Sequence, residues 1–178
     1  MMSTDQACPK MELVMQSVVA KTRNYFESEH GTPMVDVDSG AVEASSQAQL
    51  DMTAIVGLGG RVNLWAVFSF QACLVNAVHA WMTVGFQDEP EEVERHRQAA
   101  IGEWVNTILG HCTQDFGHLD KQGVPLTPPL MMDPDNVFPE MQITVFSRRY
   151  LSSRYGRLNI SLVRPQAVFP PGRPDAPR

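Results

Sequence analysis

Cysteine is scarce in this sequence, with three residues in a chain of 178. Cys8, Cys73 and Cys112 are odd in number and have no spacing typical of a disulfide framework, which excludes a disulfide-stabilised secreted scaffold. Each lies in a segment with a helical pattern or at its cap. We therefore expect reduced thiols and a cytoplasmic protein.

Positive charge is also low, because 14 Lys and Arg residues face 20 Asp and Glu residues and the formal net charge is −6. This excludes a general nucleic-acid binder, which needs clustered basic side chains to neutralise phosphates. Seven of the basic residues fall within the last 31 positions: Arg148, Arg149, Arg154, Arg157, Arg164, Arg173 and Arg178. We expect them on exposed strand positions and a tail, where charge discourages edge pairing. A basic docking patch is the alternative.

The chain has no uninterrupted apolar run long enough to span a membrane. The nearest candidate, residues 62–82, contains Asn63, Gln71, Asn76 and His79, whose side chains are costly in hydrocarbon. A strand followed by a helix explains this segment better, and we expect no membrane association. Asp5 precedes any apolar run, so no signal peptide is evident.

Signatures for metals and phosphate are absent as well. Four histidines have spacings that fit no zinc signature: His79, His96, His111 and His118. Asp133 and Asp135 resemble part of a calcium loop but lack its glycine and distal glutamate, so we expect a turn. Gly57, Gly59 and Gly60 do not precede a helix, which argues against a phosphate cradle.

What is present is a globular composition, 43% hydrophobic and 19% charged, with helical and strand patterns in mixed order. Helices are expected at about 9–26, 71–82 and 91–116. Extended segments are expected at 34–37, 52–69 (a hairpin around glycines), 121–139 (irregular or at an edge), 141–150 and 156–163. This order predicts an α+β domain over residues 1–165, with an antiparallel sheet covered by long helices. Residues 166–178 are rich in proline and are expected to form a disordered tail.

The helix expected at 91–116 has two unlike faces. Its core side is predicted to carry Ile101, Val105, Ile108, Cys112 and Phe116, with Trp104 and Leu109 at its flanks. The opposite side carries Ala99, Glu103, Asn106 and Gly110, with Gly102 at its margin. Each interior glycine costs about 1 kcal/mol relative to alanine. The pattern therefore predicts that something approaches this backbone closely.

Glu103 and Asn106 stand one helical turn apart on that bare side. Together they offer a fixed anion beside a neutral group that both donates and accepts hydrogen bonds. This pair is a poor metal site and lacks a nucleophile, but it could hold a partner's cation while the amide orients a water molecule. The alternative is that both are ordinary surface residues.

The run GEWVNTILG, residues 102–110, resembles the G-E-x-x-N-x-x-x-G signature of the CheX, CheC and FliY phosphatases, which dephosphorylate the chemotaxis response regulator CheY. The preceding glycine-containing hairpin, the acidic residues before the helix and the later PLTPPLMM segment occur in the family's order. The similarity extends over about residues 11–163. Lys21 and Asn24 occupy the matching part of the first helix, so one site is expected, as in CheX.

The resemblance implies a CheC-like fold and a phosphorylated CheY-like receiver domain as partner. Glu103 would pair with a receiver lysine, Asn106 would orient the attacking water, and Ala99, Gly102 and Gly110 would permit close docking. The protein would need no cofactor of its own, since the receiver supplies Mg²⁺. A homodimer with joined sheets is also implied.

A non-catalytic receiver-binding or scaffold module of the same fold is the alternative function. Two departures from the family pattern favour it. Trp104 would obstruct docking if it tilted outward, and residues 35–51 form a long acidic insertion.

Overall fold

The computed structural model describes residues 9–37, 50–85, 89–118, 121–132 and 143–165. Its helices are α1 (Pro9–His30), α3 (Ala72–Met82), α4 (Val93–Cys112) and the short 3-10 helix η1 (Asp115–His118). Its strands are β1 (Val35–Val37), β2 (Leu50–Leu58), β3 (Leu64–Gln71), β4 (Leu130–Met132), β5 (Ile143–Ser153) and β6 (Gly156–Pro165).

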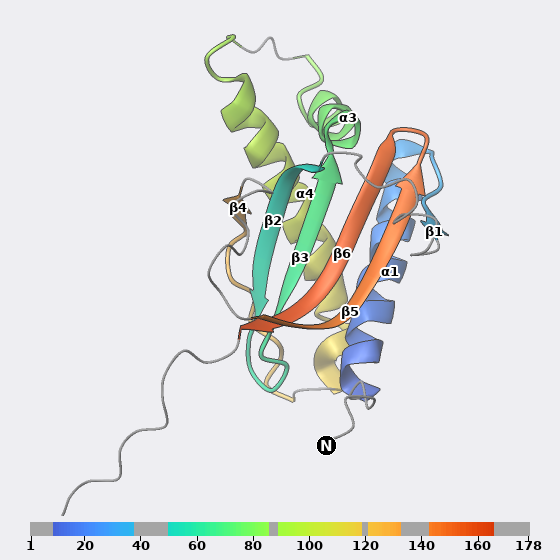
Figure 1. Cartoon of the computed structure of the whole chain (residues 1–178), viewed down its shortest axis with the longest axis vertical. Coiled ribbons are helices and arrows are strands. Elements are labelled where there is room, and N and C mark those ends of the chain that lie inside the picture. Colours follow the sequence, from blue (N-terminus) through green and yellow to red (C-terminus); the bar gives the residue numbers. More distant parts are fainter. Residues whose placement is uncertain (1–8, 38–49, 86–88, 119–120, 133–142, 166–178) are drawn as a thin grey trace, which may run out of the picture.

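All six strands form one antiparallel sheet in the order β1-β5-β6-β3-β2-β4. The hairpins β2–β3 and β5–β6 supply its four central strands, and the three-residue strands β1 and β4 lie at its two sides. Helices α1 and α4 lie side by side on one face of the sheet, with α1 behind β5 and β6, and α3 follows at the end of β3 (Figure 1). The α+β prediction of an antiparallel sheet covered by helices is confirmed.

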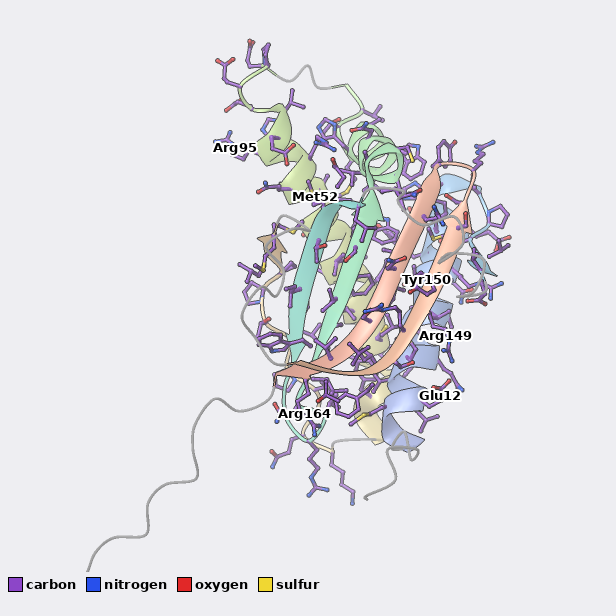
Figure 2. The ribbon with its side chains drawn as sticks, viewed as in Figure 1. Glu12, Met52, Arg95, Arg149, Tyr150 and Arg164 are labelled. Atoms are coloured by element: carbon purple, nitrogen blue, oxygen red, sulfur yellow. The ribbon has the colours of Figure 1, made fainter. Side chains whose placement is uncertain are left out.

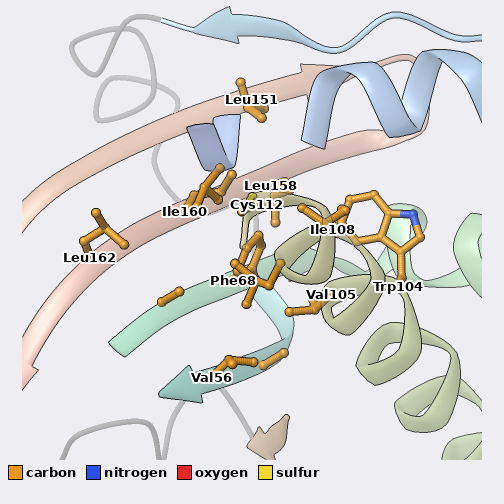
Figure 3. Packing of buried hydrophobic residues seen from close by; sticks show 14 of the residues in the cluster. Val56, Phe68, Trp104, Val105, Ile108, Cys112, Leu151, Leu158, Ile160 and Leu162 are labelled. Atoms are coloured by element: carbon orange, nitrogen blue, oxygen red, sulfur yellow. The ribbon is translucent and has the colours of Figure 1, made fainter. Parts of the chain in front are cut away.

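The core lies between this sheet face and the helices. Alternate residues of the central strands point into it, as the two-residue period of a strand requires. Figure 3 shows Val56, Phe68, Leu158 and Ile160 of the sheet packed around Val105, Ile108 and Cys112 of α4. Burial raises the pKa of the Cys112 thiol to about 12. Cys112 is therefore a protonated core side chain at neutral pH.

Several details differ from the sequence prediction. Leu13 fits a helical apolar pattern, but its side chain is 55% exposed, and Met15 is buried in its place. Strand β5 continues through Ser153, beyond the end expected at residue 150, and the turn to β6 lies at Arg154 and Tyr155. In both places the predicted type of element is correct. Tertiary packing decides which apolar residues of α1 are buried and where strand β5 ends.

The C-terminal arginines that the structure describes lie on β5, β6 and the turn between them, and several have partners in this chain. Arg149 of β5 pairs with Glu12 of α1 at 3.0 Å, and Figure 2 shows the two side chains facing each other. Arg148 donates to Ser161 Oγ at 3.1 Å, and Arg164 donates to the Asn63 carbonyl at 3.1 Å. These contacts favour surface strand positions over a basic docking patch.

No helix among the described residues is long and apolar enough to cross a membrane. Cys8, residues 38–49, Asp133, Asp135 and the tail at 166–178 lie outside the described residues. The predictions made for those positions, and the domain boundary at residue 165, stay predictions.

Candidate functional site

Helix α4 has the two faces that its sequence predicts. Seven side chains of the helix are buried: Ala100, Ile101, Trp104, Val105, Ile108, Leu109 and Cys112. Glu103 and Asn106 are exposed on the other side, together with Ala99 and Gly110, and Gly102 is half-buried. We call these five positions, 99, 102, 103, 106 and 110, the α4 ridge. The ridge is open, with its carboxylate and amide standing among small residues.

Neither polar side chain of the ridge is engaged by the part of the chain that the structure describes. Glu103 and Asn106 make no hydrogen bond or ion pair with any residue that the structure describes. An exposed carboxylate and amide one turn apart are therefore available to an incoming partner.

Packing within this chain does not require the glycines of the ridge. A Cβ atom added at Gly110 would meet nothing within 4 Å among the described atoms. One added at Gly102 would lie 3.8 Å from Met131 Sδ and 3.9 Å from Pro129 Cβ, which are ordinary contacts. The helix could therefore carry alanine at both positions. The two glycines remain consistent with the prediction that another molecule approaches the α4 backbone closely.

Trp104 does not obstruct the ridge. Its side chain is fully buried, in edge-to-face contact with Tyr25 and Phe26 of α1 and with Phe70 of β3. Figure 3 shows the indole turned toward the interior. The first argument for a non-catalytic module is thereby removed.

Helix α1 borders the ridge on the Glu103 side. The Tyr25 ring lies 6.1 Å from the His111 ring of α4, measured between centroids. Burial raises the pKa of the Tyr25 hydroxyl, and the charges of Glu29 and Glu103 raise it further. Two carboxylates therefore act on the same phenol, which marks this side of the ridge as electronegative.

A proline-containing segment borders the ridge on the Asn106 side. An open groove of about 600 Å³ runs between α4 and residues 126–131. Its α4 side includes Ala99, Gly102, Glu103 and Asn106, with Arg95 toward the start of the helix (Figure 2). We call residues 125–131 the proline wall.

The sequence predicts an irregular or edge-lying segment at residues 121–139 but does not predict that it lies beside Asn106. No local pattern relates residue 106 to residue 128, since their neighbourhood is made by the sheet. A signal was available nonetheless: Gly57 lies inside a strand, a position that often marks the close approach of another backbone.

The other candidate residues do not converge. Among the described residues there is no group of three or more His, Cys, Asp or Glu side chains arranged to hold a metal ion. His30, which the sequence did not single out, stacks on Trp81 with ring centroids 3.8 Å apart, and burial lowers its pKa. These rings contribute to packing between α1 and α3.

Comparison with known proteins identifies the relatives of this arrangement. A family model described as chemotaxis phosphatase CheX matches residues 52–143. The chain is similar in structure to CheX from Vibrio vulnificus, with a TM-score of 0.62, 14% identity and coverage of 84% of this chain and 94% of that one. No curated protein matches the chain in sequence.

Two further solved structures are similar. The CheX-CheY-BeF3-Mg complex from Borrelia burgdorferi matches with a TM-score of 0.59 and 16% identity over 86% of this chain and 97% of that one. FliY from Thermotoga maritima matches with a TM-score of 0.61 and 15% identity over 93% and 92%. At such identities the likeness establishes the fold.

Proposed function

The chain belongs to the CheX family of chemotaxis phosphatases, and we propose that it hydrolyses the phosphoaspartate of a CheY-like receiver domain. Glu103 docks a lysine of the receiver, and Asn106 orients the attacking water. Mg²⁺ is supplied by the receiver, so this chain contributes side chains alone.

The observation that carries the proposal is the open α4 ridge. Glu103 and Asn106 are exposed, neither is engaged by a described residue, and their neighbours on the ridge are alanine and glycine. An asparagine side chain is only a few bonds long. It can reach a phosphoryl group inside another protein only if the surrounding helix surface allows that protein to come close.

The electrostatics of the ridge suit a cationic group. Glu29 and Glu103 both raise the pKa of Tyr25, so their negative potentials overlap beside α1. A lysine ammonium entering there is attracted by two carboxylates, and Glu103 can accept a hydrogen bond from it. Docking by Glu103 would set the position of Asn106 over the receiver's phosphoryl group.

The chemistry asks little else of this protein. Water attacks the phosphorus in line with the P–O bond to the aspartate; that bond breaks, inorganic phosphate leaves and the free carboxylate remains. Fixing the water by the Asn106 amide converts an encounter into a positioned attack, which can be worth several kcal/mol. No covalent intermediate forms on this chain.

We also propose that the protein is a homodimer, as the family resemblance implies, and that it is cytoplasmic, as expected from its few unpaired cysteines. Within the described residues, β1 pairs with β5 at Tyr150–Ser152, near the end of an eleven-residue strand. The remaining edge of β5 is compatible with joining a second sheet. Light scattering on the purified protein tests this, and a monomeric mass at micromolar concentration would contradict it.

The test of function is to add the protein to a phosphorylated CheY-like receiver and follow both binding and phosphate release. We expect release faster than the receiver's own hydrolysis. Binding without acceleration would identify the non-catalytic receiver-binding module instead, and absence of binding would refute both functions.

A charge exchange sharpens this test. Glu103→Lys should weaken binding about tenfold, equivalent to about 1.4 kcal/mol, because it places two cations together. A receiver in which the docking lysine is changed to glutamate should restore binding of the Glu103→Lys variant. Equal affinities across all four combinations would contradict the role given to Glu103.

A further inference from the structure

We propose that the proline wall is the second docking surface for the receiver, and that Thr127 and Gly57 are positioning residues that set its distance from the α4 ridge. This inference rests on the proposed function, because it assigns the occupant of the groove as the receiver surface around the phosphoaspartate. The wall would govern affinity, whereas Asn106 would govern the chemical step.

Three hydrogen bonds attach the first part of the wall, residues 125–127, to Gly57 of β2 and to Gly59 just after it. Gly59 N–H donates to the Pro125 carbonyl at 2.8 Å, and Thr127 N–H donates to the Gly57 carbonyl at 3.0 Å. The Gly57 N–H donates to the Thr127 hydroxyl at 2.8 Å, so a side chain takes the place of a backbone acceptor there. Thr127 is thus joined to Gly57 in both directions.

The next residues cannot make such bonds. Pro128 and Pro129 have no N–H to donate, and backbone pairing resumes at Leu130, which is the partner of Ile55. Thr127 is therefore the last anchor before the two prolines that line the groove.

The register shows that the wall bulges between its anchors. Leu58 is opposite Leu126, and Ile55 is opposite Leu130. The wall therefore has one residue more than β2 over this interval, which is the pattern of a β-bulge. Bulges redirect side chains, and this one contains the prolines that line the groove opposite Gly102 and Asn106.

Two glycines, one in β2 and one just after it, allow the wall to lie this close. A Cβ atom added at Gly57 would lie 2.8 Å from Thr127 Cγ2, and one added at Gly59 would lie 2.8 Å from Pro125 Cγ. Both distances are too short for carbon atoms, so a larger residue at either position forces Thr127 or Pro125 to shift. The β2–β3 turn is formed by residues 60–62 and does not itself require Gly57 or Gly59. The close contact with the wall explains why glycine occupies these two positions.

The groove fits a partner that presses against both sides at once. Thr127 and Pro128 are exposed, and Pro129 and Met131 are half-buried, so the wall offers largely apolar surface to the groove. The other side offers the polar pair of the ridge. Prolines lose little conformational freedom on binding, so a rigid apolar wall contributes to affinity at low entropic cost. The receiver surface that meets the wall should accordingly be apolar.

The test uses a compensating pair of substitutions. Gly57→Ala introduces a methyl group against Thr127 Cγ2, whereas Thr127→Ser removes that Cγ2 and keeps the hydroxyl. Gly57→Ala should raise the Kd and KM for the phosphorylated receiver about threefold to tenfold, with kcat changed less than twofold. The double variant Gly57→Ala/Thr127→Ser should return to within twofold of the wild type.

Two more variants separate positioning from general damage. Thr127→Val removes the acceptor of the Gly57 N–H and should raise KM to a similar extent, since one hydrogen bond is worth about 0.5–1.5 kcal/mol. Gly117→Ala is the matched control, because its new Cβ would meet nothing within 4 Å, and it should leave KM unchanged. Thermal unfolding of every variant reports the fraction folded.

The outcomes distinguish this inference from the function on which it rests. Unchanged Kd and KM in Gly57→Ala and Thr127→Val, while Asn106→Ala abolishes turnover, would overturn the wall and leave the phosphatase standing. Loss of activity that only follows the folded fraction, without rescue in the double variant, would also overturn it. If the wild type binds the receiver without hydrolysing it, the Kd values of the variants still test the role of the wall. If the wild type does not bind the receiver, both the wall inference and the proposed function are refuted.

Discussion

Helices α1 and α4 cover the same face of the sheet, contact each other through Tyr25 and Trp104, and expose very different surfaces. Three charged side chains on the outer side of α1 are held in ion pairs. Glu12 pairs with Arg149, Lys21 with Asp115 at 3.5 Å, and Arg23 with Asp36 at 3.1 Å. Glu103 and Asn106 on the α4 ridge have no such partner among the described residues.

The difference shows where the molecule gives up stability. Each exposed ion pair on α1 contributes about 0–1 kcal/mol of stability. The α4 ridge gives up such pairs and carries two glycines that each cost about 1 kcal/mol relative to alanine. Violations of helix preference that nothing inside the chain requires are typical of functional surfaces.

The largest effect is expected where the two helices meet. Trp104→Ala should destabilise the protein by about 3–5 kcal/mol, because the indole is fully buried among Tyr25, Phe26 and Phe70. Urea unfolding followed by circular dichroism measures it. A loss below about 1 kcal/mol, the range of an ordinary surface substitution, would mean that Trp104 is not the contact that joins α4 to α1.

A bulky side chain on the ridge should separate stability from function. Gly110→Leu should reduce receiver binding tenfold or more, while unfolding shows equal or greater stability, since leucine favours helix and the site is open. Ala20→Leu on the exposed side of α1 is the matched control. Equal binding by both variants would show that docking does not use the ridge.

The smallest effect is expected when α1 is given the missing acid. Lys21→Glu creates a Glu-x-x-Asn spacing with Asn24, yet it should add no phosphatase activity in an Asn106→Ala background. The new carboxylate would lie near Asp115, and the Arg23–Asp36 pair would remain beside it. Stability should fall by up to about 1 kcal/mol. Restored turnover would show that spacing alone makes a site, whatever the surrounding surface.

Sequence periodicity predicted much of this architecture. The core side of α4 and the β2–β3 hairpin follow from patterns that repeat within one element, where local geometry decides which residues share a face. Trp104 is predicted only at the flank of that side, and its full burial is set by packing against α1 and β3. The exposed pair Glu103 and Asn106 follows from the same periodicity. Their proposed roles come from the family signature and not from spacing.

The second side of the groove could not be found in this way. Residues 106 and 128 become neighbours because β2, β4 and α4 pack together, and no pattern along the chain encodes that proximity. Leu13 shows the related limit within a helix: two apolar phases overlap in α1, and packing against β5 and β6 selects the one that buries Met15.

The central claim is most directly tested by a single-turnover reaction of saturating protein with phosphorylated receiver, comparing Asn106→Ala with Asn24→Ala. Both replace an exposed asparagine on neighbouring helices. The account predicts that Asn106→Ala lowers the rate of phosphate release about 100-fold with receiver affinity nearly unchanged, while Asn24→Ala matches the wild type. Equal rates for the two variants, with both binding the receiver, would contradict it.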